Sequence, residues 1–192
     1  KAVKPLPSRK MKQQVPLIDC FTAPCKEGCP IHQDITAYLQ LVKEEKYEEA
    51  LQVIIEKNPL PFITGTICSH ACMGKCTRNF YEEPVYIRGM KLIAAENGYE
   101  ALMEKLETPA VTRPGKAAVI GGGPAGMAAV YFLRRAGMEV TLFEKNNALG
   151  GVVRHVIPEF RIPGSAIDRD AAHLKKMGVN IFLNSETSDI SM

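Results

Sequence analysis

The residues of this 192-residue chain that are best suited to chemistry are its six cysteines, which lie in two short clusters. The clusters are Cys20, Cys25 and Cys29, followed by Pro30, and then Cys68, Cys72 and Cys76. Short spacings let several thiolates converge on one inorganic core, and a proline after the last cysteine is typical of bacterial ferredoxins. The pattern therefore predicts iron–sulfur clusters.

Two other uses of the cysteines are weighed against this prediction. Structural zinc favours cysteine pairs separated by two residues, and neither cluster contains such a pair. Disulfides suit secreted domains, but residues 1–5 lack the apolar stretch of a secretory signal. We therefore expect a cytoplasmic iron–sulfur protein. The alternative is a zinc-stabilised interaction module with a degenerate nucleotide fold.

A glycine-rich turn at residues 121–126 is the second motif with chemical meaning. It fits the dinucleotide-binding pattern, with glycines at 121, 123 and 126. Gly121 would make the tight turn, Gly123 would let a pyrophosphate approach the backbone, and Gly126 would let helix and strand pack closely. The start of the following helix would favour the phosphate charge.

Glu144 lies at the end of the next expected strand, 23 positions after Gly121. A carboxylate there accepts hydrogen bonds from ribose hydroxyls and repels a 2′-phosphate, so the fold should bind FAD or NAD rather than NADP. The competing interpretations are a glycine loop that binds nothing and, for Lys145, a solvated surface charge.

The elements that must position these motifs change type along the chain. Before residue 115 apolar residues recur at helical spacing, which predicts helices that start after Asp34 as N-cap, at 47–57, and at 86–106 with a break at Gly98. The pattern then becomes β-α-β. It predicts strands at Lys116–Ile120, Glu139–Phe143 and 179–183, and helices at 124–136 and 167–177.

Composition limits the classes of partner. Hydrophobic residues make up 46% and charged residues 23%, which is ordinary for a globular protein. No apolar run approaches the roughly 18 residues of a membrane span. Basic residues gather before Asp19, but three prolines interrupt them without any aromatic residue, which favours a solvated linker over a nucleic-acid patch. We expect neither nucleic acid nor membrane as a partner.

The cysteine segments also resemble a known family. Residues 17–30, LIDCFTAPCKEGCP, resemble the cluster segment shared by the glutamate synthase small subunit and dihydropyrimidine dehydrogenase. Residues 67–72 and 76–78 are similar as well, most of all to the YgfK-type subunits named for selenate reduction. The resemblance covers nearly the whole chain from residue 15. It implies an α-helical ferredoxin-like domain with two [4Fe-4S] clusters, followed by an α/β Rossmann-type FAD-binding domain.

The resemblance implies a division of the ligands between the clusters. One cluster would be held by Cys20, Cys25 and Cys76, and the other by Cys29, Cys68 and Cys72. A further cysteine and a Gln or Glu ligand of the family correspond here to Leu17 and Lys91. Each cluster therefore has three cysteine ligands, and its core could be [3Fe-4S]. The candidates for a fourth ligand are Asp19, Glu27, His32, His70 and solvent.

FAD contacts follow from the same resemblance. Residues 149–152 resemble the second glycine pair of family flavoproteins, and residues 157–163 resemble a segment whose arginine contacts FAD. Without the family, Arg161 would be read as a surface ion pair. The expected cofactor-binding residues are Ile67, Gly121, Gly123, Pro124, Ala125, Gly126, Glu144, Lys145, Gly151, Val152 and Arg161.

We therefore divide the chain into a linker at 1–16, an α-helical iron–sulfur domain at 17–108 and the N-terminal part of an FAD-binding domain at 113–192. The chain lacks an initiator Met, and we expect a piece of a longer oxidoreductase that is inactive alone. NAD(P)H, bound by the missing part, would reduce FAD, and the clusters would carry electrons to another domain of the same chain or to an acceptor subunit.

Overall fold

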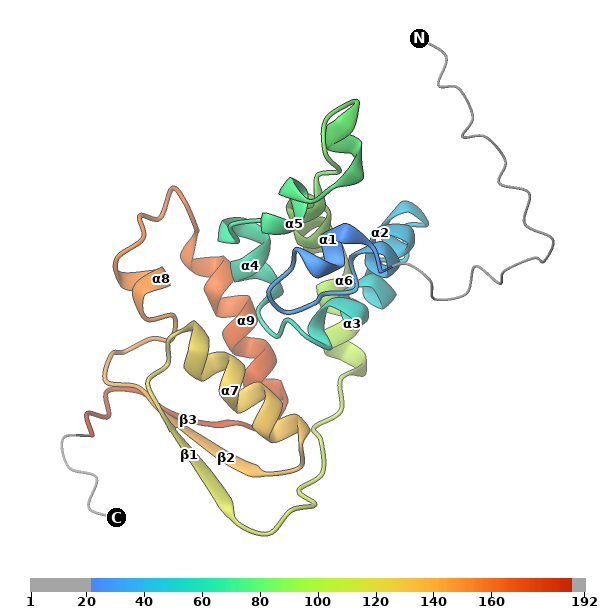
Figure 1. The fold of residues 1–192 in the computed structure, drawn as a ribbon. Coiled ribbons are helices and arrows are strands. Elements are labelled where there is room, and N and C mark those ends of the chain that lie inside the picture. Colours follow the sequence, from blue (N-terminus) through green and yellow to red (C-terminus); the bar gives the residue numbers. More distant parts are fainter. Residues whose placement is uncertain (1–21, 188–192) are drawn as a thin grey trace.

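The computed structural model describes residues 22–187 as a helical half followed by a small α/β half (Figure 1). The linker prediction for 1–16 and the predictions on Leu17, Asp19 and Cys20 lie outside the described residues. The helical elements are α1 (Pro24–Glu27), α2 (Ile35–Lys43), α3 (Tyr47–Ile55), α4 (Pro61–Ile67), α5 (Ala71–Gly74), the 3-10 helix η1 (Thr77–Phe80) and α6 (Ile87–Lys105). None of the described helices is long and apolar enough to cross a membrane.

Helices α2, α3 and α6 confirm the three helices expected from the apolar spacing. They bury one face each in a shared core, with Ile35 and Tyr38 of α2 about 1% exposed. The expected break at Gly98 is wrong, because α6 continues through this residue. A Cβ at Gly98 would overlap the carbonyl oxygen of Tyr47 at the start of α3. The glycine serves close packing of two helices rather than a turn.

The α/β half contains β1 (Lys116–Ile120), α7 (Pro124–Arg135), β2 (Glu139–Phe143), α8 (Val152–His155), α9 (Gly164–Lys176) and β3 (Asn180–Phe182). The strands form one parallel sheet in the order β1-β2-β3, with Lys116 opposite Glu139. Helices α7 and α9 lie over the same face, as right-handed crossovers require (Figure 1). The first two strands confirm the prediction, and β3 is shorter than expected.

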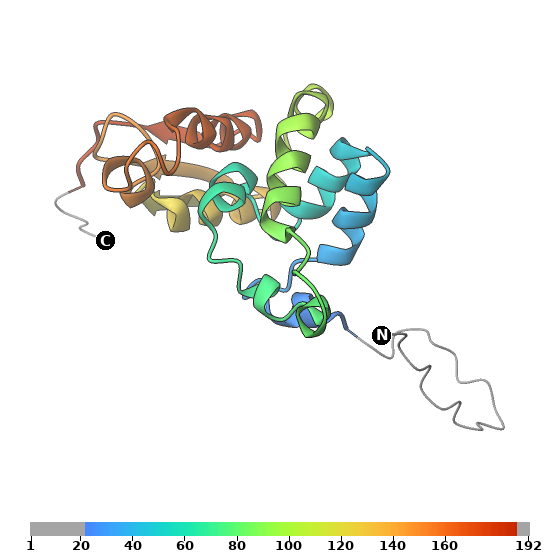
Figure 2. The ribbon, with the colours of Figure 1, turned by 90° about the horizontal axis from the view of Figure 1, so that it is seen from above.

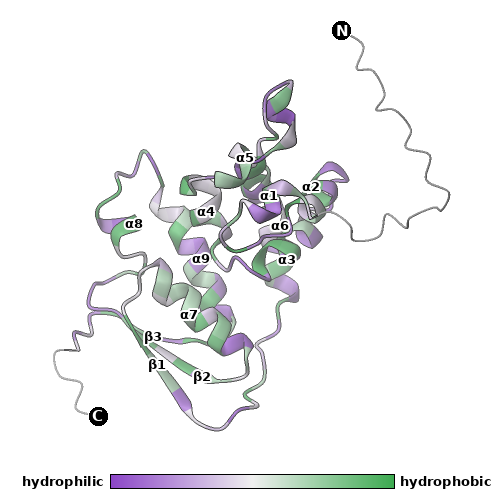
Figure 3. Cartoon of the chain, viewed as in Figure 1, coloured by the Kyte–Doolittle hydropathy of each residue, from purple (hydrophilic) through white to green (hydrophobic). Residues whose placement is uncertain are grey.

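Buried and less buried side chains alternate along β2, so one face of the sheet is covered by helices and the other is open. Val140 and Leu142 of β2 are fully buried under the helices. On the other face Phe143 stacks on Phe182 with ring centroids 5.5 Å apart, and Ile120 is 51% exposed. Figure 3 shows the hydrophobic colouring of these strands.

The two halves pack against each other through α4 and α9 (Figures 1 and 2). Asp170 of α9 accepts hydrogen bonds from the backbone N–H groups of Phe62, at 3.2 Å, and Ile63, at 2.9 Å. Arg169 lies over the Phe62 ring, 5.1 Å from its centroid. Because the residue before Pro61 is Leu60, which has no polar side chain, Asp170 serves as the cap of α4 from more than a hundred residues away.

Candidate cofactor sites

Two cysteines of the second cluster, Cys68 and Cys72, meet Cys29 at one cavity in the helical half, which has a volume of about 180 Å³. Cys68 caps the C-terminus of α4, Cys72 lies in α5, and Cys29 follows α1 by two residues. Other lining residues include Gln33, Tyr38, His70, Arg88 and Lys91. The fold thus brings together three thiols from two separate stretches of sequence.

Cys25 and Cys76 lie near each other because α1 packs on α5. Burial raises the pKa of the Cys25 thiol, and the neighbouring Cys76 and Cys29 raise it further. Their expected third partner, Cys20, lies outside the described residues. The five described cysteines are free thiols, so they do not form the disulfides considered above among themselves.

The three thiols of this cavity are the type of donor that iron–sulfur clusters use. Within residues 22–187 no three Cys, His, Asp or Glu side chains lie close enough to hold one metal ion. In an iron–sulfur cluster each thiolate binds a different iron, so the sulfurs stand further apart than around one ion. Burial raises the pKa of Cys72, and the metal would have to displace that proton.

Two buried polar residues, Gln33 and Lys91, line the same cavity. Gln33 is 3% exposed, and its side-chain oxygen accepts no hydrogen bond from the described residues. Lys91 is 8% exposed. Burial lowers the pKa of Lys91, although the thiolate charges of Cys68, Cys29 and Cys72 act to raise it. Unpaired polar atoms are expected where an inorganic group completes the interior.

Of the described residues expected as a fourth cluster ligand, only His70 lines this cavity. His70 lines the cavity in a left-handed backbone conformation, with φ of 48°. Its Nδ1 lies 3.2 Å from the Cys68 carbonyl oxygen, which also accepts a hydrogen bond from Arg88. Glu27 and His32 are exposed and are not among the residues lining this cavity.

The glycine turn links β1 to α7 as the dinucleotide pattern requires. The Gly121 N–H donates to the Phe143 carbonyl oxygen at 2.8 Å, and its φ of 98° suits glycine. A Cβ at Gly126 would overlap the Gly121 carbonyl oxygen. At Gly123, by contrast, a Cβ would meet only the Gly151 Cα, at 3.9 Å, which leaves open space beside the turn at the start of α7.

The second glycine pair lies directly on this turn. The Gly150 N–H donates to the Gly122 carbonyl oxygen at 2.8 Å. Gly151 approaches Gly123 so closely that a Cβ on Gly151 would lie 2.9 Å from the Gly123 Cα. Pro124 and Ala125 form the first turn of α7, with Ala125 exposed. The expected cofactor-binding residues of the turn and of the second glycine pair therefore share one region.

Glu144 is 4% exposed and is held by three donors. Its Oε2 accepts the Gly122 N–H at 2.6 Å, and its Oε1 accepts the backbone and side-chain N–H of Asn146, both at 2.8 Å. Burial acts to raise the pKa of Glu144, but these hydrogen bonds outweigh it and the pKa is lowered. The side chain is a fixed carboxylate that secures the glycine turn.

A second cavity of about 260 Å³ lies at the carboxyl ends of the strands, where α/β sheets bind ligands. Gly121, Glu144 and the exposed Lys145 line it together with Ile120 and Phe143. Residues 185–187 complete the lining. The sequence reasoning missed residues 185–187, although the rule that parallel strands end at one edge could have indicated them.

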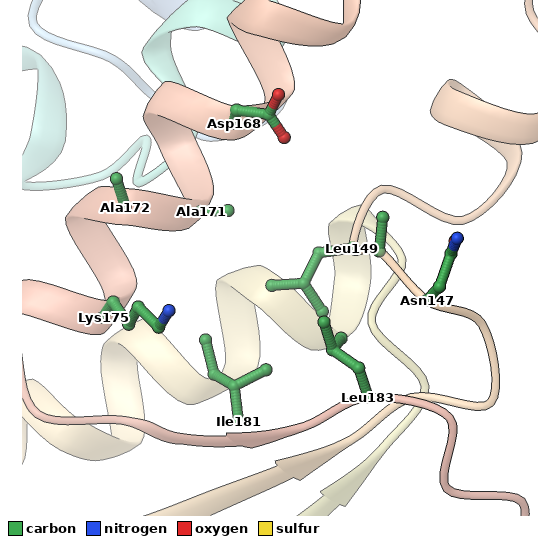
Figure 4. A pocket seen from close by; sticks show the side chains of 9 residues that line it. Asn147, Leu149, Asp168, Ala171, Ala172, Lys175, Ile181 and Leu183 are labelled. Carbon is green, nitrogen blue, oxygen red and sulfur yellow. The ribbon is translucent and has the colours of Figure 1, made fainter.

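The remaining expected residues stand apart from these cavities. Val152 begins α8 and is 63% exposed, and Ile67 is the half-buried last residue of α4. Arg161 is exposed in the loop before α9, and within residues 22–187 its side chain has no ion-pair or hydrogen-bond partner. A further cavity of about 290 Å³, between α9 and β3, contains none of the expected site residues (Figure 4).

A helical, cysteine-lined domain joined to a glycine-turn nucleotide fold defines an iron–sulfur oxidoreductase module. Residues 7–102 match the family described as dihydropyrimidine dehydrogenase domain II, 4Fe-4S cluster, and the chain belongs to this family. Residues 119–186 match the NAD(P)-binding Rossmann-like domain.

The individual relatives are oxidoreductases or their subunits by name. YgfK of Escherichia coli (strain K12), which carries an oxidoreductase name, is 44% identical over 92% of this chain. The NADP(+)-dependent formate dehydrogenase subunit beta of Moorella thermoacetica is 35% identical over 89% of the chain. The NAD-dependent dihydropyrimidine dehydrogenase subunit PreT of Salmonella typhimurium is 34% identical over 87%.

The chain spans only part of these relatives. It covers 17% of YgfK, 27% of the formate dehydrogenase subunit and 41% of PreT. The resemblance inferred from the cysteine segments is confirmed, and so is the combination of an iron–sulfur domain with a Rossmann-like domain. The similarity therefore concerns this module and not the complete activities of the longer proteins.

Proposed function

We propose that this chain is the electron-transfer module of a larger NAD(P)H-dependent oxidoreductase, with FAD at the glycine turn and two iron–sulfur clusters in the helical half. When bound, FAD exchanges two electrons with a nicotinamide and releases them singly, which lets it feed one-electron clusters. The convergence of Cys29, Cys68 and Cys72 on one cavity is the observation that carries the proposal.

The residues of the chain have distinct tasks in this proposal. The described cysteines would bind iron, with Cys25 and Cys76 joined by Cys20 at the other cluster. Gly123 would leave room for the FAD pyrophosphate, whose charge the start of α7 would stabilise. The cavity beside Glu144 would take the adenosine end, with Lys145 at its rim.

The choice of FAD rests on Glu144 and on the second glycine pair. A carboxylate at the end of β2 disfavours a 2′-phosphate, which argues against NADP in this site. Gly151 lies against Gly123. We propose that Gly151, Val152 and Arg161 contact the flavin side of the cofactor. The proposed contact of Ile67 with flavin would join α4, and hence Cys68, to the same cofactor.

The nicotinamide site and the electron acceptor would belong to other domains of the complete protein or to a partner subunit. The relatives differ in the partner their names mention, such as formate dehydrogenase or dihydropyrimidine dehydrogenase. We propose no membrane and no nucleic acid as partner, a cytoplasmic location, and no activity for the module alone.

The test is anaerobic reconstitution with iron, sulfide and FAD, followed by determination of all three. Wild type should bind FAD and show cluster absorbance. Gly123→Ala should weaken FAD binding about tenfold or more, about 1.4 kcal/mol, because its methyl group fills the pyrophosphate space. It should leave thermal unfolding and iron content unchanged, since a Cβ there meets only one atom, at 3.9 Å.

Gly74→Ala is the matched control, because a Cβ there also enters open space but far from the glycine turn. It should bind FAD like wild type. Unchanged FAD affinity in Gly123→Ala would contradict the proposed flavin site. A colourless protein that retains zinc after reconstitution would favour the zinc-stabilised module instead.

A further inference from the structure

The cysteine-lined cavity gathers positive charge and has no carboxylate to balance it. Arg88 and Lys91 of α6 line it, and of the described residues no Asp or Glu does so. Arg88 is half-buried and forms no ion pair within residues 22–187. The start of α6 adds charge of the same sign, because the N–H groups of a first helical turn carry the positive end of the helix dipole. These surroundings favour an anionic occupant.

Arg88 stands at a helix position that is unfavourable for a cation. It is the second residue of α6, and the first turn of this helix contains no acidic residue. The helix dipole destabilises a positive charge at the N-terminus and stabilises one at the C-terminus. The stability of α6 therefore does not account for an arginine here.

A hydrogen bond fixes the Arg88 guanidinium beside one of the thiols. Its Nη1 donates to the Cys68 carbonyl oxygen at 3.1 Å and lies 3.4 Å from Nδ1 of His70. The backbone N–H of His70 in turn donates to the Cys68 sulfur at 3.4 Å. The guanidinium is thus held on the turn that presents this thiol to the cavity. A neutral amide could also donate to the carbonyl oxygen, so the hydrogen bond alone does not require a charge.

The charge of Arg88 is permanent. Arginine stays protonated in proteins, whereas burial lowers the pKa of the neighbouring Lys91 and the charge of Arg88 acts in the same direction. The potential of an iron–sulfur cluster depends on its net charge and on its surroundings, and each electron that it accepts makes it more negative by one unit. A fixed cation beside it therefore stabilises the reduced form more than the oxidised form.

We propose that Arg88, through its charge, raises the reduction potential of the iron–sulfur cluster held by Cys29, Cys68 and Cys72. In the transfer the reduced flavin loses one electron and the cluster gains it, and no bond to Arg88 forms or breaks. This inference rests on the proposed function, since it requires a cluster at this cavity.

The test is a potential titration of the anaerobically reconstituted full chain with dithionite, in which electron paramagnetic resonance records the reduced clusters. In Arg88→Gln the equilibrium constant for one cluster reduction should fall about tenfold, which lowers its midpoint potential by about 59 mV. Arg88→Lys retains a positive charge and should stay near wild type. Arg135→Gln is the matched control, because it removes an exposed arginine that also donates to a backbone carbonyl oxygen, that of Glu56. It should leave every midpoint unchanged.

The outcomes separate the inference from its basis. Failure of wild type to form any cluster would overturn the proposed function. Equal midpoints in wild type and Arg88→Gln would overturn only the role of Arg88. An equal shift in Arg88→Lys and Arg88→Gln would do the same, because charge would then not be the cause. If either Arg88 variant loses a cluster that wild type holds, Arg88 serves assembly instead, and the inference is likewise overturned.

Discussion

Replacing Asp170 by alanine tests the contact that joins the two halves. The change removes the acceptor of two buried N–H groups, those of Phe62 at 3.2 Å and Ile63 at 2.9 Å. A buried donor left without a partner costs about 1–3 kcal/mol. The loss of both acceptors should therefore lower the free energy of unfolding by about 2–5 kcal/mol. Asp168→Ala, which removes an exposed ion pair with Arg154, should cost about 1 kcal/mol or less.

The assay is urea denaturation followed by circular dichroism, combined with hydrogen exchange at the amides of Phe62 and Ile63. Burial raises the pKa of Asp170 to about 7, against the effect of the two N–H donors, so its contribution to stability is lost as pH rises through about 7 and the two variants are compared at about pH 5. Both amides should exchange faster in Asp170→Ala. The reasoning fails if this variant is as stable as Asp168→Ala, or if the two amides stay protected.

Two further predictions concern the α/β half. Gly126→Ala should destabilise the fold by about 3 kcal/mol or more with or without FAD, because its Cβ overlaps backbone at Gly121; a melting temperature equal to that of Gly123→Ala would contradict this. Burial lowers the pKa of His173 to about 4, with the Pro59 backbone opposing. The unfolded chain binds a proton below about pH 6.5 that the folded chain rejects, so this stability is complete above about pH 6.5 and falls by about 3 kcal/mol toward about pH 4. His173→Gln should remove this fall. The contribution of Asp170 titrates in the opposite direction and is lost as pH rises through about 7, but it is the same in wild type and in His173→Gln. It therefore cancels when the unfolding free energy of the variant is subtracted from that of wild type. A difference that stays constant with pH would refute the argument.

Local patterns predicted the elements whose causes are local. Apolar spacing identified α2, α3 and α6, and the period-two and glycine signals indicated β1 and β2 with their bounds. Helix α4 escaped prediction because its cap, Asp170, is supplied from far along the chain. The function of Gly98 was misread for the same reason, since the backbone it approaches belongs to another helix.

In the candidate site, too, features with local signals were predicted and features that depend on distant residues were not. The cysteine spacing and the glycine turn are sequence signals, and both proved to lie at cavities. The burial of Lys91 beside the thiols depends on how α6 packs on α4, which no short segment encodes. Glu144 was expected to face ribose, and its hydrogen bonds to Gly122 and Asn146 became visible only in the folded chain.

The cap that Asp170 provides for α4 has a consequence for the order of synthesis. A ribosome releases Cys68 about a hundred residues before it releases Asp170, so the helix that carries this cysteine emerges with its first turn unsupported. The first turn of α4 therefore gains its cap only after the α/β half has been synthesised. Cutting the chain within the connector at 106–115 would separate a helix from its cap and yield an N-terminal piece that retains metal poorly.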